Sequence, residues 1–133
     1  MDLENKYLER LLKDFNQKKK IKVVWDAGNG SAGKLMKKLA NKIQGEKIIL
    51  FDEINGNFPN HHPDPSDSNN LIDCQKNIIK SNLDIGLAFD GDGDRLGVVD
   101  NEGKIISQDR FLMLLAKDIL KDSPKAKIIF DVK

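Results

Sequence analysis

Short apolar runs alternate with helical patterns along most of the chain, and this alternation most constrains its fold. The runs at residues 21–25 and 48–51 are rich in β-branched residues and have the length of strands. Between them, apolar residues recur with helical spacing at positions 35–43, and we expect this helix to stop at Gly45. A helical connection of about 12 residues lets the second strand return parallel to the first. Residues 21–51 therefore predict one βαβ unit.

The same alternation continues after residue 70. A helical period at 71–83, expected to be capped by Ser68 or Asn69, is followed by a third apolar run at 85–89. Two further apolar runs within 96–106 are joined by a short polar link with a glycine, which predicts a hairpin. The remaining expected elements are an N-terminal helix over 3–15, a helix over 109–121 and a strand over 127–131. Together they predict an α/β layered domain with a mixed, mostly parallel sheet flanked by helices.

Composition excludes several classes of protein. The chain has 133 residues, about one domain's worth, and 22 Lys and Arg against 21 Asp and Glu give no basic surface for nucleic acid. No run approaches the roughly 18 apolar residues of a membrane-spanning helix, and Met1–Glu4 are too polar for a signal peptide. The single cysteine, Cys74, rules out an intramolecular disulfide and is expected to be a small apolar helix residue. We therefore expect a cytoplasmic protein that binds neither nucleic acid nor membrane.

The strongest chemical signal directly follows the third apolar run. Asp90, Asp92 and Asp94 alternate with glycines, and Arg95 ends the series. Three carboxylates so close together repel one another unless a cation lies among them. Alternate side chains share one side of an extended chain, and the glycines let the chain curl so that three oxygens meet at one ion. Such oxygens select Mg²⁺, Mn²⁺ or Ca²⁺ rather than zinc, and the end of a buried strand is where α/β sheets place ligands.

Two other interpretations of this acidic segment are weaker. A solvated acidic turn needs one Asp-Gly pair rather than three. A calcium loop of the EF-hand kind would make the chain a calcium-binding interaction module, but it requires glycine at the position of Arg95 and glutamate at the position of Asn101. Arg95 itself is either a counter-charge for the carboxylates or a fork that grips a substrate phosphate or sugar oxygen.

Glycines also mark the exit of the first strand. Gly28, Gly30 and Gly33 form a G-x-G-x-x-G pattern with Asp52 about 20 residues downstream, which is typical of dinucleotide-binding βαβ modules. Asp26, however, precedes the glycines and would place a carboxylate against a bound pyrophosphate. We therefore favour a structural turn from strand to helix. A dinucleotide site and an anion or interdomain contact at the helix N-terminus remain as alternatives.

A proline-rich segment over 53–70 interrupts the regular pattern. Three prolines within seven positions exclude a continuous helix or strand there. A loop of this length in a compact domain is usually functional or closely packed. His61 and His62 are neighbours, and adjacent side chains on an extended chain point in opposite directions, so they rarely bind one ion. We expect them to take part in loop packing or in an interdomain contact.

Three segments of the chain occur together in a pattern with a known counterpart. They are Val-Trp-Asp-Ala-Gly-Asn-Gly at 24–30, Gly-Asn-Phe-Pro-Asn-His-His-Pro-Asp-Pro at 56–65 and Phe-Asp-Gly-Asp-Gly-Asp-Arg at 89–95. With them the chain resembles the α-D-phosphohexomutase family, in its phosphomannomutase/phosphoglucomutase branch, from about residue 20 to the end. The resemblance implies reversible conversion of hexose 1-phosphate to hexose 6-phosphate through a phosphoserine and a bisphosphorylated intermediate.

The resemblance also assigns roles to residues. It implies that Asp90, Asp92 and Asp94 hold Mg²⁺ together with a phosphoserine oxygen, and that Arg95 lies beside the hexose phosphate substrate. No segment of this sequence is similar to the family's Thr-Ala-Ser-His-Asn-Pro loop, which carries the phosphoserine. We therefore expect no catalytic residue in these 133 residues and no activity from the chain alone.

Family members have four domains, and this chain is similar to the second and the opening of the third. The implied division is an N-terminal helix and linker at 1–19, the metal-loop domain at 20–103 and an incomplete third domain at 104–133. A piece of about 30 residues cannot build its own core. Its helix and strand are expected to cover the sheet of the preceding domain or to pair with a second copy of the chain. The other expected partners are the remaining domains of the same enzyme.

Overall fold

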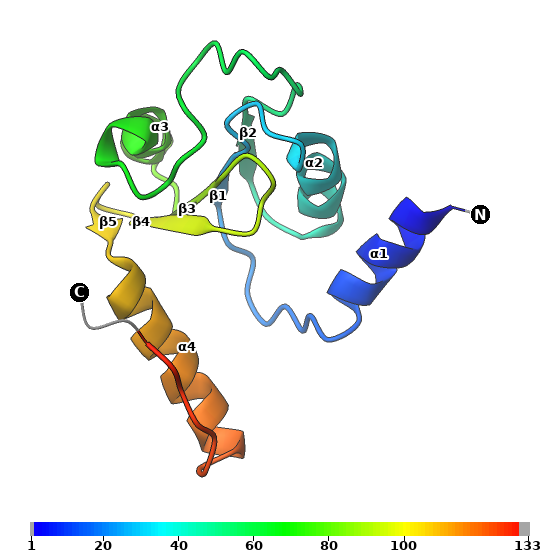
Figure 1. The fold of residues 1–133 in the computed structure, drawn as a ribbon, viewed down its shortest axis with the longest axis vertical. Coiled ribbons are helices and arrows are strands. Elements are labelled where there is room, and N and C mark those ends of the chain that lie inside the picture. Colours follow the sequence, from blue (N-terminus) through cyan, green and yellow to red (C-terminus); the bar gives the residue numbers. More distant parts are fainter. Residues whose placement is uncertain (1, 131–133) are drawn as a thin grey trace.

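The computed structural model describes residues 2–130 as a mixed sheet with helices on both faces (Figure 1). The elements in chain order are α1 (Leu3–Leu12), β1 (Val23–Asp26), α2 (Gly33–Lys42), β2 (Lys47–Leu50), the 3₁₀ helix η1 (Ser68–Leu71), α3 (Ile72–Ser81), β3 (Ile85–Phe89), β4 (Leu96–Asp100), β5 (Ile105–Ile106) and α4 (Gln108–Asp122). The strands lie in the order β2-β1-β3-β4-β5. β1 is parallel to β2 and β3, whereas β4 is antiparallel to β3 and β5. The expected α/β layered fold with a mixed sheet is confirmed.

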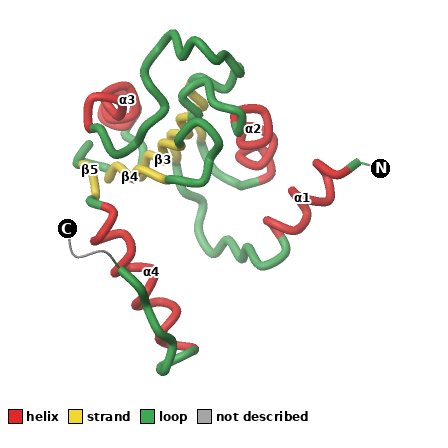
Figure 2. The backbone as a smooth tube through the Cα atoms, in the orientation of Figure 1, coloured by secondary structure: helices red, strands yellow, loops and turns green. Residues whose placement is uncertain are grey.

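The inner strand β1, which lies between β2 and β3, supplies side chains to both halves of the core. Val23 and Trp25 pack with Met36 and Ala40 of α2 on one face. Val24 points to the opposite face, because successive side chains of a strand alternate. Figure 2 shows α2 and α3 on opposite sides of the strands. The buried cluster on the α3 side consists of Val24, Leu71, Cys74, Ile78, Leu83, Ala88 and Val99.

Cys74 lies in this second cluster, as its expected role as a small apolar helix residue requires. Its side chain is fully buried and forms no disulfide. Burial raises the pKa of the thiol to about 12, so the group is neutral at physiological pH.

The packing between β3 and α3 leaves no room for a methyl group at Gly86. A Cβ there would overlap the Cys74 sulfur and lie 2.8 Å from Cδ1 of Ile78. We expect Gly86→Ala to lower the free energy of unfolding by about 1–3 kcal/mol, the usual cost of overpacking a core, as measured by urea denaturation. Gly56→Ala is the matched control, because nothing lies within 4 Å of a Cβ at that position. Equal losses in the two variants would contradict this description of the core.

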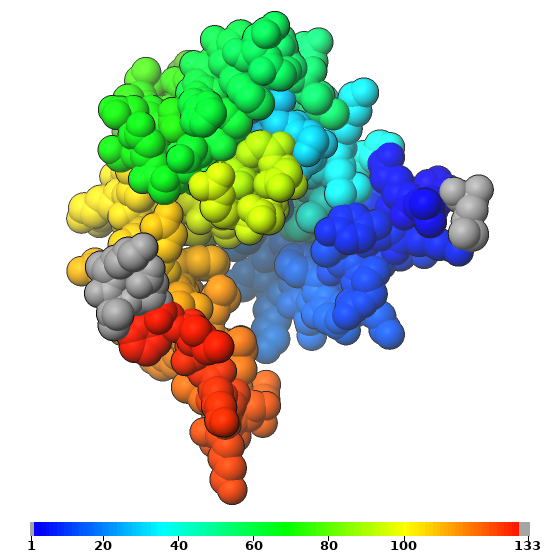
Figure 3. Space-filling view, viewed as in Figure 1, coloured from blue at the N-terminus to red at the C-terminus, as the bar shows by residue number. Residues whose placement is uncertain are grey.

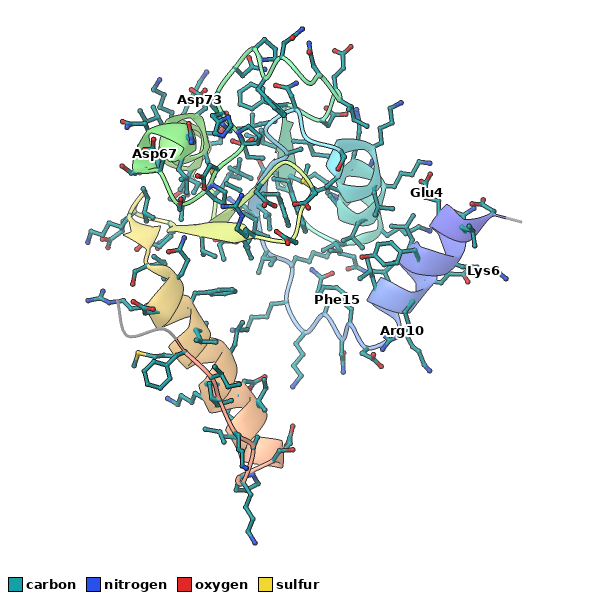
Figure 4. The ribbon with its side chains drawn as sticks, in the orientation of Figure 1. Glu4, Lys6, Arg10, Phe15, Asp67 and Asp73 are labelled. Carbon is teal, nitrogen blue, oxygen red and sulfur yellow. The ribbon has the colours of Figure 1, made fainter. Side chains whose placement is uncertain are left out.

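α1 is shorter than expected, because it ends at Leu12 rather than near Phe15. Leu8 is its buried residue, and Glu4 forms an ion pair with Lys38 of α2. Figure 4 shows α1 beside α2, with Glu4 on the side of α1 that faces α2. Phe15 is about half exposed, so a further helical turn would bury little apolar surface.

The expected caps of the third helix are wrong. Ser68 and Asn69 lie inside η1, which precedes α3. The carboxylate of Asp67 caps η1 instead, because it accepts a hydrogen bond from the Asn69 backbone N–H at 2.9 Å. The helical stretch therefore starts earlier than the apolar period indicates, with a tighter first turn.

The expected helix over 109–121 is confirmed as α4, but this helix does not cover the sheet. It extends away from β5, and none of its side chains is buried (Figure 1). The expected strand over 127–131 is wrong for residues 127–130, which form no strand, and residue 131 lies outside the described residues. Figure 1 shows the segment after α4 turning back alongside that helix, and no strand follows β5 within residues 2–130. Pairing with a second copy stays a prediction. Among residues 2–130, none of the helices combines the length and the apolar character that a membrane span requires.

Candidate metal centre

The loop of residues 90–95, called the acidic loop below, joins the end of β3 to the antiparallel strand β4. Asp90 is buried at 2% exposure, whereas Asp92 and Asp94 are exposed. Gly93 has a φ of +79°, a conformation that favours glycine and lets the loop curl. One carboxylate oxygen from each aspartate lies within 4.8 Å of the other two. The structure therefore brings together the three carboxylates that the sequence singles out.

Hydrogen bonds fix the charged form of Asp90. Its Oδ1 accepts from the backbone N–H groups of Gly93 at 2.9 Å and Arg95 at 3.1 Å. Its Oδ2 accepts from Nε of Arg95 at 2.7 Å. Burial alone would raise the pKa of Asp90, but the backbone and guanidinium of Arg95 outweigh it and lower the pKa to about 2. Asp90 is therefore an anion at neutral pH.

The three carboxylates repel one another in the absence of a cation. The pKa of Asp94 is raised because its carboxyl group shares a hydrogen bond with Asp90 and lies near the charge of Asp92. A divalent cation among the three oxygens would relieve this repulsion. The donor set consists of oxygen only, which fits Mg²⁺ rather than zinc. Within residues 2–130 no other group of three acidic, histidine or cysteine side chains converges in this way.

Arg95 bridges the acidic loop and the proline-rich segment of residues 53–70, called the proline-rich loop below. Besides its bond to Asp90, its Nη1 donates to Oδ1 of Asp64 at 3.3 Å. Its side chain is 59% exposed, and the neighbouring carboxylate of Asp90 raises its pKa. Arg95 is thus a counter-charge in this structure, and its guanidinium is also open to solvent.

Asp64 is a site residue that the sequence alone does not single out. It lies between Pro63 and Pro65, which are both buried and hold the loop against the body. The only local signal is a charged residue between two prolines, and that pattern does not say which distant group it meets.

The glycine turn of residues 28–33 packs against the acidic loop and supports it. A Cβ at Gly30 would lie 2.6 Å from the carbonyl oxygen of Gly91. The same oxygen accepts a hydrogen bond from the Ser31 backbone N–H at 2.7 Å. Figure 3 shows the acidic loop in yellow-green next to both the light-blue turn and the green proline-rich loop. Gly28 and Gly30 are buried, so the open turn that a dinucleotide site needs is not found, and the turn is structural.

Asp26 turns inward, away from the surface where a ligand would bind. Its Oδ1 accepts from the Gly28 backbone N–H at 2.9 Å, and its Oδ2 lies 3.1 Å from Nε2 of His61. Nδ1 of His61 lies 2.9 Å from the carbonyl oxygen of His62. Both neighbours accept hydrogen bonds, so the doubly protonated ring fits this position. His61 therefore packs the loop onto β1, while His62 is exposed.

The pair of Asp26 and His61 predicts a pH-dependent stability. The hydrogen bond that the His61 ring donates to the Asp26 carboxylate raises the pKa of His61 above 6.5, although burial opposes the shift. A group whose pKa is raised by folding stabilises the fold fully below its unfolded pKa and loses this effect as pH rises through the folded value. We therefore expect the free energy of unfolding, from urea denaturation, to fall as pH rises from about 6.5. The fall should vanish in His61→Gln and persist in His62→Gln, and the same fall in both variants would contradict the assignment.

Comparison with known proteins decides the family. Residues 5–103 match the family model described as phosphoglucomutase/phosphomannomutase, alpha/beta/alpha domain II. The chain belongs to the phosphoglucomutase/phosphomannomutase family. Over 133 residues it is 50% identical to a phosphomannomutase/phosphoglucomutase of Pseudomonas putida, and over 132 residues it is 48% identical to a phosphoglucomutase of Neisseria gonorrhoeae. These alignments cover 100% and 99% of this chain but 29% of each relative.

A solved member of the phosphoglucomutase/phosphomannomutase family has the same fold. It is a protein from Burkholderia thailandensis, which superposes with a TM-score of 0.87 at 46% identity. The match covers 91% of this chain and 26% of that protein. The family resemblance read from the sequence is therefore confirmed, and the chain spans less than a third of the length of these relatives. The residues matched to domain II include the acidic loop and both helices that cover the sheet, and exclude α4.

Proposed function

We propose that this chain is the metal-binding middle domain of a phosphohexomutase, with Mg²⁺ held by Asp90, Asp92 and Asp94. The observation that carries the proposal is the approach of three carboxylate oxygens to within 4.8 Å, at the exit of a central strand in a mutase domain. The charged Asp90 and the two exposed aspartates form an oxygen site that is open to solvent. Mg²⁺ usually binds through such carboxylates while it keeps several waters.

The proposed reaction of the longer enzyme interconverts hexose 1-phosphate and hexose 6-phosphate through a phosphoserine and a bisphosphorylated intermediate. When bound, Mg²⁺ supplies charge neutralisation for the phosphoryl group that is transferred. Arg95 contributes a planar fork of N–H donors beside the acidic loop, suited to a phosphate or sugar oxygen of the substrate. The Asp90 carboxylate and the backbone of the glycine turn keep this loop in place.

The proposed domain division is a helix and linker at 1–19, the metal-loop domain at 20–103 and the opening of the next domain at 104–133. The match to domain II covers residues 5–103, so its end supports the second boundary, whereas its start within α1 does not support the first. α4 has no buried side chain, which supports packing against other domains of the same chain. A cytoplasmic location is part of the proposal, supported by a single buried cysteine that forms no disulfide.

The chain alone is expected to be inactive. No serine loop of the Thr-Ala-Ser-His-Asn-Pro kind is present to donate a phosphoryl group. A coupled assay with glucose 1-phosphate and glucose 1,6-bisphosphate should therefore show no glucose 6-phosphate above the background without protein. Turnover that scales with the concentration of this chain would contradict the prediction.

Mg²⁺ titration followed by NMR tests the metal site itself. The backbone amides of Gly91 and Gly93 lie within the acidic loop, so their resonances should shift and saturate as Mg²⁺ is added. Asp92→Asn should weaken this response strongly. Asp73→Asn, which removes a carboxylate from α3 and not from the acidic loop, should leave it unchanged. We expect weak affinity, because a ligand from another domain is missing. Submicromolar Mg²⁺ affinity would contradict the incomplete site, and no response in the chain would contradict the proposed function.

A further inference from the structure

Arg95 is bonded to two carboxylates from different parts of the chain. Its Nε donates to Asp90 at 2.7 Å, and its Nη1 donates to Asp64 at 3.3 Å. Asp90 belongs to the proposed metal site, whereas Asp64 lies 31 residues before Arg95 in the proline-rich loop. Nε of Arg95 also lies 3.9 Å from Oδ1 of Asp94, a longer ion pair within the same site. The guanidinium is therefore hydrogen-bonded to one carboxylate inside the proposed metal site and to one outside it.

A cation in the acidic loop would compete with Arg95 for Asp90. Oδ1 of Asp90 already accepts two backbone N–H groups, from Gly93 and Arg95. Oδ2 accepts no backbone N–H and is bonded to the Arg95 Nε, so it is the oxygen with more capacity for a metal ion. A divalent cation beside a guanidinium also adds like-charge repulsion, which is strong at short range in a partly buried site. Metal binding therefore favours a position of the guanidinium farther from Asp90.

Asp64 is held in place as a second acceptor. Its Oδ1 accepts from the backbone N–H of Ser66 at 3.0 Å and from the Ser66 hydroxyl at 2.7 Å. Its carbonyl oxygen accepts from Nδ2 of Asn70 at 2.9 Å. The bonds from Ser66, with the charge of Arg95, lower the pKa of Asp64, so the carboxylate stays charged.

The loop that carries Asp64 is also anchored to the sheet. His61, three residues before Asp64, is bonded to the fully buried carboxylate of Asp26 at the end of β1. The two prolines that flank Asp64 are buried, and Pro63 packs against Gly28. Asp64 therefore lies on a fixed part of the loop and not on a free tip.

We propose that Asp64 is a positioning residue for Arg95, which exchanges its bond to Asp90 for a closer pairing with Asp64 when a divalent cation occupies the acidic loop. This inference rests on the proposed metal site. The exchange needs only rotation of a long, largely exposed side chain, because Nη1 already contacts Asp64. Asp64 thereby favours cation binding and keeps the guanidinium beside the metal, where a substrate oxygen would meet it.

A double-mutant cycle tests this role with Mg²⁺ as the probe. The chain, Asp64→Asn, Arg95→Gln and the double variant are titrated with Mg²⁺, and the Gly91 and Gly93 amides report the affinity. Asp64→Asn keeps an acceptor for Ser66 but removes the charge, and we expect about two- to fivefold weaker Mg²⁺ binding, in line with a solvent-exposed ion pair. Arg95→Gln should tighten binding, and adding Asp64→Asn to it should change nothing further.

Two further readouts separate positioning from a general charge effect. The Nε–H resonance of Arg95 should shift on saturation with Mg²⁺ in the unsubstituted chain, and Asp64→Glu, which keeps the charge, should recover most of the affinity. Asp67→Asn is the control in the same loop, since its carboxylate caps η1 beside α3 (Figure 4), and it should leave the affinity unchanged. Equal weakening by Asp64→Asn with and without Arg95, or no weakening at all, would overturn the inference. No Mg²⁺ response in the unsubstituted chain would overturn the metal site and the inference together.

Discussion

Gly30→Ala is expected to abolish Mg²⁺ binding and to lower the free energy of unfolding by about 1–3 kcal/mol. The added Cβ would lie 2.6 Å from the carbonyl oxygen and 2.9 Å from the Cα of Gly91. Both are backbone atoms, so no side-chain rotation can relieve the clash, and the acidic loop must move. The Ser31 hydrogen bond to the same carbonyl would be lost with that movement. NMR titration measures the binding, and urea denaturation measures the stability.

Gly91→Ala is the matched control on the other side of this contact. A Cβ at Gly91 has one neighbour within 4 Å, Cγ of Pro63 at 3.5 Å, which is an ordinary van der Waals contact. This variant should fold and bind Mg²⁺ as the unsubstituted chain does. If Gly30→Ala bound Mg²⁺ equally well, the glycine turn would not be the support of the acidic loop.

Asp26→Ala is expected to lower the free energy of unfolding by about 3 kcal/mol, because it leaves buried partners without an acceptor. The Gly28 backbone N–H and the His61 ring both lose their bonds to this fully buried carboxylate. The proline-rich loop then loses its anchor on β1. Urea denaturation at pH 6, where His61 is protonated, measures the loss.

Asp52→Ala provides the comparison for that loss. It removes an ion pair with Lys37 at 2.7 Å, in which the two side chains are 29% and 53% exposed. Such surface pairs contribute about 0–1 kcal/mol. If Asp26→Ala lowered the free energy of unfolding no more than Asp52→Ala does, the buried pair of Asp26 and His61 would not anchor the proline-rich loop.

Local patterns were sufficient to predict the sheet and its covering helices. The apolar runs at 21–25 and 85–89 correspond to β1 and β3, and the helical stripe between β1 and β2 corresponds to α2. The spacing of apolar side chains along the sequence predicts these elements, because those side chains form the buried clusters on the two faces of β1. The grouping of the alternating aspartates was equally local, since all three belong to one tight loop.

Contacts between distant segments could not be predicted in this way. Prolines exclude regular structure in the loop that carries His61 and Asp64, but they do not define its path. That His61 and His62 point in opposite directions follows from their adjacency in the sequence. Which of the two faces Asp26 depends on the path of the loop, and in the structure it is His61. The run at 127–130 has the composition of a strand, yet a strand forms only where an edge is available to pair with it.

Anomalous diffraction from crystals of this chain soaked in Mn²⁺ tests the central claim most directly. Mn²⁺ prefers the same oxygen ligands as Mg²⁺ and is visible by its anomalous signal. We predict one peak among the carboxylates of Asp90, Asp92 and Asp94, with Arg95 displaced toward Asp64. A map with no peak in the acidic loop, or with its peak at another group of residues, would contradict the assignment of this loop as the metal centre.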